Sequence, residues 1–543
     1  METSPSRSTS TNGRNFWLVL AALLVSLFLA ILESVCCLKV YVYPFSSLTY
    51  PRFKYAISTA LPVIVQELHS DDFLWVASSY GIASTVLLPL SGGLAEIIGR
   101  RPVILFSIAL FAIGSIIGGA ARNMNILIAA RTVQGAGAGG VFSLTQIILS
   151  DLVTLQERGK YNGLFGLVWA IGGGVGPIVG GSLASPLRWR WLFYLNAPIA
   201  GLAFVLILFF LHVPTPSGNW KEKMLRIDLI GNLIIIGATC SLAIALTWGG
   251  VISPWSSPRV LVPLCLGVIG LVAFLCYEWL WATYPVVPLQ LMSNRTTMSG
   301  YMQIALAAFI NINLIYYLPV YYQACKDSSP TASGVDLFGL SFSTAPFSIL
   351  AGVSITGAKR YRPQIWIAWC TLLIGIGLLS SITENTSRAA SIGFQVIIGI
   401  GIGILYSAAY FPVLAPLPVT SNALALSFFI FIRTLTQIWG ITVGGAVLQN
   451  ILQRRAPGSL PCPFSSTNLA YSIIHCVPTL PGPLKDQVRA AFADGLQTIW
   501  RIMIGVSGAG LLSSLLMKPF SLHTTKDENW ALQEKEKLDS TQL

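Results

Sequence analysis

Long apolar runs, separated by short polar stretches, fill most of the chain. A helix that crosses the hydrocarbon core of a bilayer needs about 20 consecutive apolar residues, whereas strands of a membrane barrel alternate between apolar and polar positions over about ten residues. The long runs therefore predict membrane-spanning helices. We count roughly 14 runs of this length: 16–35, 73–97, 103–121, 125–150, 162–184, 191–212, 228–249, 260–282, 297–320, 335–356, 364–382, 390–412, 421–449 and 496–517.

The composition of the chain supports this pattern. Of its 543 residues, 54% are hydrophobic and only 10% are charged, and the mean hydropathy is +0.70. Because soluble domains carry about 25% charged residues, most of this chain has no water to face. Lipid-exposed backbone must satisfy its own hydrogen bonds, so the sequence predicts an all-α integral membrane protein.

The chain has a net charge of +12, and its basic residues are unevenly distributed. They gather in alternate short loops, and loops rich in lysine and arginine stay in the cytoplasm. We therefore expect these loops and both ends of the chain on the cytoplasmic side, and we attribute the charge to topology rather than to nucleic-acid binding. The basic loop residues are Arg100, Arg101, Arg158, Lys160, Lys221, Lys223, Arg226, Lys359, Arg360 and Arg362.

The opposite loops are expected outside the cell. One of them carries the sequon Asn385-Thr386-Ser387, which predicts glycosylation of Asn385, while the inward sequon at Asn294 should stay bare. The long outside loop at 450–495 holds Cys462 and Cys476. An oxidising compartment permits a disulfide between these two cysteines, and two free thiols are the alternative.

The loop between the second and third runs combines glycines with charges. It reads Gly92-Gly93-Leu94-Ala95-Glu96-Ile97-Ile98-Gly99-Arg100-Arg101. Glycine permits a tight turn, and an acid beside two arginines can form a charge latch that breaks and re-forms; an ordinary basic turn is the alternative. The pattern resembles the signature loop of the major facilitator superfamily.

This resemblance implies two six-helix bundles that rock around a central cavity, with two extra central helices. We expect the bundles at 16–212 and 283–517 and the extra helices within 213–282. Cytoplasmic tails are expected at 1–15 and 518–543, the latter polar and disordered from Thr524. The resemblance also implies that Glu96 and Arg100 latch the inward-closed state, and the latch residues are Gly92, Glu96, Gly99, Arg100 and Arg101.

The fourth run places an arginine among apolar and small residues. Arg131 is followed by Gln134 and by glycines with GxGxxG spacing, but no strand precedes them, so a dinucleotide site is a false match. Small residues instead let helices approach closely in lipid. A charge within a span marks a functional site by default, unless it snorkels to the interface. In the superfamily, the matching arginine is associated with proton coupling.

The fifth run carries regularly spaced glycines and a proline. Glycines at this spacing leave a groove for a neighbouring helix, and proline bends the helix axis, so simple helix packing is the alternative to a functional motif. The spacing resembles the antiporter motif of drug:proton exchangers, which implies export rather than uptake. The motif residues are Gly163, Gly172, Gly176, Pro177, Gly180 and Gly181.

The first run ends in an acid and then departs from the superfamily pattern. Leu32-Glu33-Ser34 and Ser58-Thr59-Ala60-Leu61-Pro62 are both present, but 23 residues separate them where the family has only a few. We interpret 36–55 as an atypical insertion, either a translated intron or a genuine extracellular segment. Glu33 is the acid that we assign to proton binding, with Arg131 tuning it, because a carboxylate held away from water can take up and release a proton.

Polar and aromatic residues of the later runs are candidates for lining the central cavity. Tyr317-Leu318-Pro319-Val320-Tyr321 and the stretch from Arg433 to Gln437 resemble fungal drug:proton antiporters. Arg433 either lines the cavity or fixes two helices together, and Glu278 is expected at the membrane interface. The cavity candidates are Gln134, Tyr317, Arg433 and Gln437.

Together these features predict a proton-coupled antiporter that exports small amphipathic organic compounds such as drugs, toxins or secondary metabolites. We expect a monomer that uses the proton gradient, with no cofactor and no metal, in the plasma membrane or alternatively the vacuolar membrane. A siderophore or basic amino-acid transporter, or a non-transporting sensor on the same fold, stays open. An enzyme is not expected, because the chain carries no acid/base cluster, nucleophile motif, metal-ligand spacing or phosphate loop.

Overall fold

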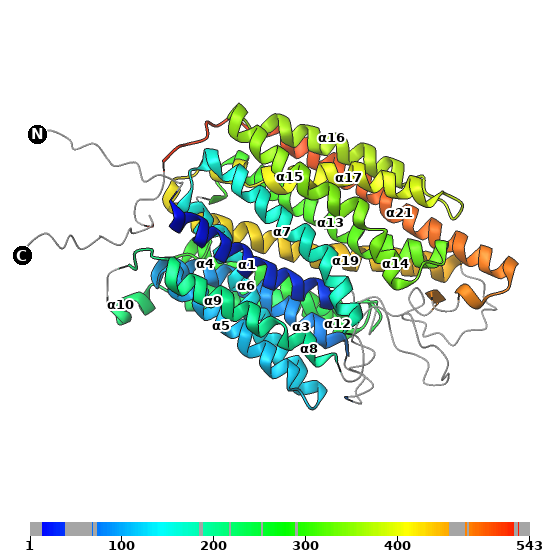
Figure 1. Ribbon diagram of the computed structural model, residues 1–543, viewed down its shortest axis with the longest axis horizontal. Helices are drawn as coiled ribbons and strands as arrows, with labels where there is room; N and C mark the ends of the chain where they lie inside the picture. The colour runs from blue at the N-terminus through cyan, green and yellow to red at the C-terminus, as the bar shows by residue number, and fades with distance from the viewer. Residues whose placement is uncertain are drawn as a thin grey trace, which may run out of the picture.

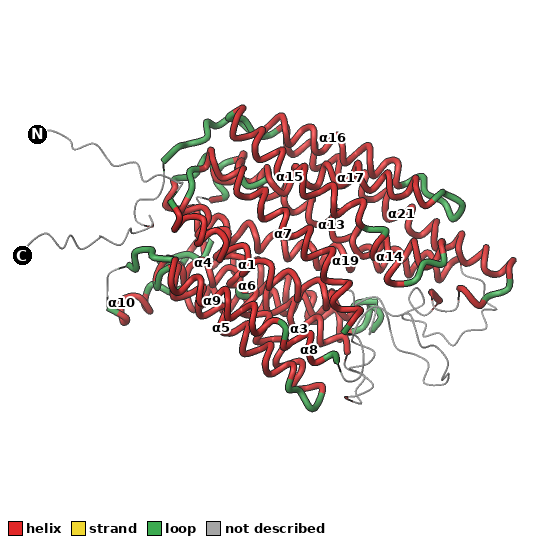
Figure 2. Tube along the Cα trace, viewed as in Figure 1, coloured by secondary structure: helices red, strands yellow, loops and turns green. Residues whose placement is uncertain are grey.

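The described part of the chain is helical throughout, without a named strand (Figure 2). Twelve of its helices are long and apolar enough to cross a membrane. Two more long helices, α6 and α7, are rich in glycine and polar residues and bring the spans to the expected 14. The computed structural model describes residues 13–38, 68, 73–183, 188–216, 219–250, 253–287, 291–455, 473–474, 477–525 and 530.

The first half of the chain supplies six spans. The second span consists of two helices, α3 and α4, because Pro89 at the start of α4 cannot continue the hydrogen-bond ladder of α3. The helices of this half are α1 (Arg14–Leu38), α3 (Phe73–Val86), α4 (Leu88–Ile97), α5 (Arg100–Gly119), α6 (Met124–Leu152), α7 (Leu155–Ser182), α8 (Arg190–Tyr194) and α9 (Asn196–Phe210).

A helical hairpin follows, formed by α11 (Leu229–Trp248) and α12 (Pro258–Leu280) after the short α10 (Trp220–Leu225). Helix α11 contacts α3 of the first half and α19 of the second half. Trp75 and Trp248 meet edge to face at 5.8 Å, and the Thr442 hydroxyl donates to the Leu246 carbonyl at 3.2 Å. Helix α12 packs on α11 and exposes large apolar side chains such as Ile269 and Trp279, as a lipid-facing helix does.

The second half of the chain supplies the remaining six spans. Two of its helices reach further than expected: α19 continues to Arg455 and α21 begins at Gly482, so both extend into the predicted 450–495 loop. The helices are α13 (Arg295–Lys326), α14 (Pro330–Val335), α15 (Phe338–Ala358), α16 (Arg362–Leu379), α17 (Arg388–Ala408), α18 (Phe411–Leu414), α19 (Asn422–Arg455) and α21 (Gly482–Leu515), with 3-10 turns at Val419–Ser421 and Val477–Thr479.

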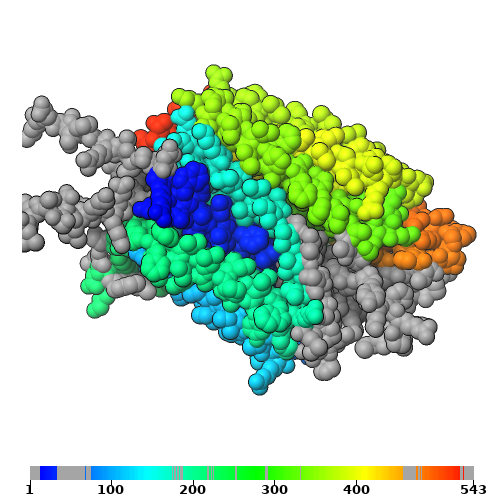
Figure 3. Space-filling view, viewed as in Figure 1, coloured from blue at the N-terminus to red at the C-terminus, as the bar shows by residue number. Residues whose placement is uncertain are grey.

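The two halves form two bundles that lie side by side. In Figure 1 the first half, blue to cyan, lies below the second half, yellow-green to orange, and Figure 3 shows the same division on the surface. Apolar side chains of α1, α5, α6 and α9 form the core of the first bundle, and a larger cluster fills the second. Helix α7 packs against α15, and α4 against α19, across the boundary. The predicted two-bundle fold with an extra hairpin is therefore confirmed.

Two expectations fall largely on residues that the structure does not describe. Residues 36–38 of the interpreted insertion continue α1, and 39–55 lie outside the described residues. Cys462 and Cys476 also lie outside them, so the disulfide stays a prediction.

Candidate functional site

A buried ion pair joins the two charged residues that were assigned to proton coupling. Glu33 comes from the last turns of α1, and Arg131 from the second turn of α6. Arg131 Nη1 contacts Glu33 Oε1, and the two residues are 1% and 3% exposed. Arg131 therefore does not snorkel to the interface. Charges this far from water persist only when they are paired and hydrogen-bonded.

Neighbouring helices complete the surroundings of this pair. Gln134, one turn along α6, accepts from Arg131 Nη1 at 2.7 Å, and Arg131 Nε donates to the Val76 carbonyl of α3 at 3.0 Å. The amide of Asn196, from α9, donates to Glu33 Oε2. The ring of Tyr80 lies 4.3 Å from the Arg131 guanidinium carbon. Residues from α1, α3, α6 and α9 thus converge on one charge pair.

This arrangement can couple a proton to helix packing. A proton added to Glu33 would neutralise the carboxylate and remove the counter-charge of Arg131. A buried arginine without its partner is strongly unfavourable, so the helices around it would gain by rearranging. The pair therefore has the chemistry that a proton switch would need.

The latch loop differs from expectation in its charge pairing. Arg100 is 2% exposed, and its Nε lies 3.1 Å from Oδ2 of Asp151 at the end of α6. Its Nη1 also donates to the Ala95 carbonyl at 2.8 Å. The expected pairing of Arg100 with Glu96 is corrected: within the described residues, the carboxylate on Arg100 is that of Asp151. Sequence reasoning missed Asp151 because it closes an apolar run far from the loop.

Gly99 explains how the loop turns. Its φ of +116° lies in the region that favours glycine, and it stands directly before α5, two residues after α4 ends at Ile97. The next arginine, Arg101, donates through Nη2 to the Leu208 carbonyl at the end of α9 at 2.5 Å. The two arginines of the motif therefore bind different helices of the same bundle: Arg100 binds α6, and Arg101 binds α9.

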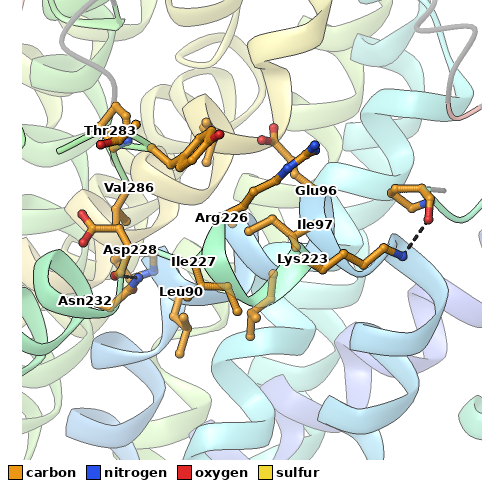
Figure 4. A pocket seen from close by; sticks show the side chains of 17 residues that line it. Leu90, Glu96, Ile97, Lys223, Arg226, Ile227, Asp228, Asn232, Thr283 and Val286 are labelled. Carbon is orange, nitrogen blue, oxygen red and sulfur yellow. Dashed lines mark hydrogen bonds between the residues drawn. The ribbon is translucent and has the colours of Figure 1, made fainter. Parts of the chain in front are cut away.

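Glu96 instead lines a cavity of about 400 Å³ beside the loop. In Figure 4, Arg226 reaches toward Glu96, and Lys223 donates to the Pro216 carbonyl at 2.6 Å. The cavity lies between α4, the stretch that leads into α11, and residues 283–286. None of the four cavity candidates lines it.

The two bundles touch at the end of the molecule that holds this loop, which we call the latch end. The Ser427 hydroxyl of α19 donates to the Leu88 carbonyl of α4 at 2.7 Å. A Cβ built on Gly92 would lie only 2.6 Å from Ser427 Cβ, and one on Gly159 of α7 would lie 2.5 Å from the Gly352 carbonyl oxygen of α15. Contacts this close mean that the latch end is closed.

Glycines of the expected antiporter motif lie where α7 meets other helices. A Cβ on Gly163 would be 2.8 Å from Ile349 Cα of α15, and a Cβ on Gly172 would be 2.5 Å from Ile31 Cγ2 of α1. The groove predicted from the spacing is therefore present at these two positions. The remaining motif residues, Gly176, Pro177, Gly180 and Gly181, lie within the same helix.

The four cavity candidates occupy different surroundings. Gln134 is buried, and its amide donates to the Ser115 hydroxyl at 2.8 Å. Tyr317 is 1% exposed and donates to the Ile441 carbonyl, so it ties α13 to α19. Arg433 lies 5.6 Å from the Trp169 ring and thus links α19 to α7 across the bundles. Gln437 is half-buried on α19. The assignment of these four residues to the cavity stays a prediction.

Two polar residues outside the predicted set have defined roles. Asn196 anchors Glu33, a role that was not predicted, although Asn196-Ala197-Pro198 resembles the start of the sixth helix in 14-helix drug:proton antiporters. Glu278 is 5% exposed, and its two carboxylate oxygens accept from the backbone N–H groups of Val286 and Val287 at 3.2 Å each. Glu278 is therefore buried near the end of α12, where the chain folds back and covers it, and its place at the membrane interface stays a prediction.

Asn385 of the predicted glycosylation sequon is exposed in the turn between α16 and α17. The inward sequon residue Asn294 instead caps α13, accepting from the Thr296 N–H at 2.9 Å.

Several known proteins are similar to this chain over nearly its whole length. A family model described as Major Facilitator Superfamily matches residues 45–441. "Efflux pump FUS6" of Gibberella fujikuroi is 34% identical over 548 residues, covering 98% of this chain and 94% of that protein. "MFS-type efflux pump LUC4" of a Fusarium species is 34% identical, covering 96% and 91%. "MFS efflux transporter aclA" of Aspergillus oryzae is 34% identical, covering 100% and 96%.

A solved structure has the same fold. The human organic anion transporter MFSD10 matches with a TM-score of 0.56 and 14% identity, covering 91% of this chain and 100% of that chain. At this identity the likeness concerns the fold alone.

Proposed function

This chain belongs to the Major Facilitator Superfamily, and from that premise we propose that it is an antiporter that exports small amphipathic organic compounds in exchange for protons. The observation that carries the proposal is the buried pair of Glu33 and Arg131. Such a pair is costly in a membrane span, and intramembrane charges of this kind mark ion and substrate pathways.

Export rather than uptake is supported by two independent points. The glycines of α7 keep the antiporter spacing, and Gly163 meets α15 of the other bundle at close range. The relatives named above are described as efflux pumps or efflux transporters. We therefore assign outward transport to this chain, with fungal toxins and secondary metabolites as the substrate class.

The proton would act through Glu33. With the carboxylate charged, the ion pair holds α1 against α6, and Asn196 holds it against α9. A proton that arrives from the outer side of the membrane neutralises Glu33. Arg131 then lacks its counter-charge and would pair with another group. Release of this proton to the cytoplasm restores the pair, so one cycle moves a proton inward and a substrate outward.

The test uses inside-out membrane vesicles with an acidic interior and a panel of amphipathic fluorescent dyes. The parent chain should accumulate at least one dye only while the gradient is present. Glu33→Gln should fold, since the glutamine oxygen still accepts from Arg131, but should lose gradient-driven accumulation. The panel includes a ferric siderophore and arginine, because movement of these compounds alone would favour the other transporter class.

The double variant Glu33→Gln with Arg131→Gln separates coupling from packing. It removes both charges of the pair, so it should be at least as stable as the single variant, which leaves Arg131 without its counter-charge. Gradient-driven accumulation by the double variant would mean that the pair has a structural role only, and the proton assignment would then be abandoned.

A further inference from the structure

The chain beyond α21 crosses from one bundle to the other at the latch end. Its first described residues are held by the second bundle. The Lys518 N–H donates to the Thr296 hydroxyl at 3.0 Å, and the Tyr361 hydroxyl donates to the Lys518 carbonyl at 2.8 Å. Met517 and Leu522 are buried, at 3% and 8% exposure. This stretch is therefore fixed to α13 and to the start of α16.

The same stretch then approaches the first bundle. His523 lies against the backbone of Leu414 and close to Arg158 of α7. Burial, together with the nearby Arg158 guanidinium, lowers the pKa of His523 below its ordinary value, so this imidazole is neutral at pH 7. Arg158 in turn donates through Nη2 to the Ser150 carbonyl at 2.9 Å, next to the Asp151 that pairs with Arg100.

Trp530 ends this path on the latch itself. Its ring lies 3.5 Å from the guanidinium carbon of Arg100, and the tryptophan is only 9% exposed. Arg100 is 2% exposed and already pairs with Asp151 through Nε, so Trp530 covers a charge that has a bound carboxylate. The expectation of a disordered tail from Thr524 is corrected at this position.

We infer that residues 516–525 and Trp530, which we call the C-terminal strap, hold the latch end closed, and that Trp530 is a positioning residue for Arg100. The strap begins on the second bundle and ends on the first, so opening of the latch end must break its contacts or lift it away. The inference rests on the proposed function only in assuming that the latch end opens and closes during transport.

The contact between Trp530 and Arg100 sets the size of the expected effect. A cation–π contact between the exposed and the fully desolvated limits is worth about a factor of ten in an equilibrium constant, and tryptophan is the best aromatic partner. Loss of the indole should therefore shift the balance between closed and open latch ends by about tenfold toward the open form.

The test reads the latch end directly, without a substrate. Ser427→Cys is introduced as a reporter into the full chain after the native cysteines have been replaced, since Ser427 is 2% exposed at the closed interface. A hydrophilic maleimide then reaches it only when the latch end opens. Trp530→Ala should raise the labelling rate about tenfold, and Trp530→Phe should give an intermediate rate.

Trp281→Ala is the matched control, because Trp281 is 70% exposed at the end of α12 and touches no latch residue among the described contacts. It should label at the parent rate. A parent-like rate for Trp530→Ala, or an equal rise for Trp281→Ala, overturns the inference; if Trp530→Ala does not fold, a parent-like rate for Trp530→Phe does so. Since labelling needs no dye and no gradient, failure here is distinct from failure of the exporter proposal.

Discussion

The side chain of Arg131 makes polar contacts with residues of three helices, α1, α3 and its own α6. It holds Glu33 from α1 and the Val76 carbonyl from α3, while Gln134 supports it within α6. Removing one partner of a buried ion pair costs about 3–5 kcal/mol, because the other charge is left without compensation. Lysine would not substitute for Arg131, since a single ammonium lacks the planar fork that reaches several acceptors at once.

At the same scale, Asn385 offers a test of topology. Because it is exposed in the turn between α16 and α17, we expect a glycan there when the chain is expressed in a eukaryotic host. Asn385→Gln should remove a mobility shift that glycosidase treatment also removes. Asn294→Gln is the control and should leave the electrophoretic mobility unchanged. A glycan on Asn294 would mean that the assigned orientation in the membrane is reversed.

Helix α7 joins the two bundles through positions where no side chain fits. Gly159 and Gly163 face α15, and Gly172 faces α1. Gly173, the next residue, has no heavy atom within 4 Å of a built Cβ. The helix therefore contains both crowded and open glycine positions a few residues apart.

This contrast gives a prediction for the element. Gly163→Ala places a methyl group 2.8 Å from Ile349 Cα, and overpacking of this kind costs about 1–3 kcal/mol. We expect a lower thermal unfolding temperature and slower transport than for the parent. Gly173→Ala introduces the same methyl group into open space and should match the parent, so equal effects of the two variants would exclude packing as the reason for the glycine spacing.

Sequence reasoning predicted site residues best where a charged residue stood within an apolar run. Glu33 and Arg131 stood out as charges within apolar runs, and the structure brings them together. Asp151 and Trp530 gave no such signal, because an acid at the end of a span and a tryptophan in a polar tail are ordinary locally. Their roles depend on which distant segments the fold brings to Arg100, and chain order does not encode this directly. Helix ends were also hard to place, since α21 begins at Gly482 in a polar stretch that a search for apolar runs does not detect.

At the scale of the molecule, closure of the latch end depends on direct contact between the bundles. Gly92 of α4 and Ser427 of α19 approach so closely that a Cβ on Gly92 would lie 2.6 Å from Ser427 Cβ. Gly93 beside it has open space around its Cβ position. A methyl group at position 92 would therefore collide with α19, whereas one at position 93 would not.

We therefore predict that Gly92→Ala shifts the protein toward the open latch end and that Gly93→Ala does not. Distances between spin labels on the latch ends of α4 and α19 should lengthen in the first variant only. Adding Ser427→Gly to Gly92→Ala removes the clashing side chain and should restore the short distance. If Gly92→Ala keeps the parent distance distribution, the contact does not control closure.

The hairpin of α11 and α12 makes the two sides of the transporter unequal. Because α11 touches both α3 and α19, it lies against both bundles on that side, whereas on the opposite side α7 packs directly on α15, with smaller contacts to α14 and α17. A compound dissolved in a lipid leaflet therefore meets the added hairpin on one side and the helices of the two bundles themselves on the other. Lateral recruitment of cargo from the bilayer would have to proceed through the side without the hairpin.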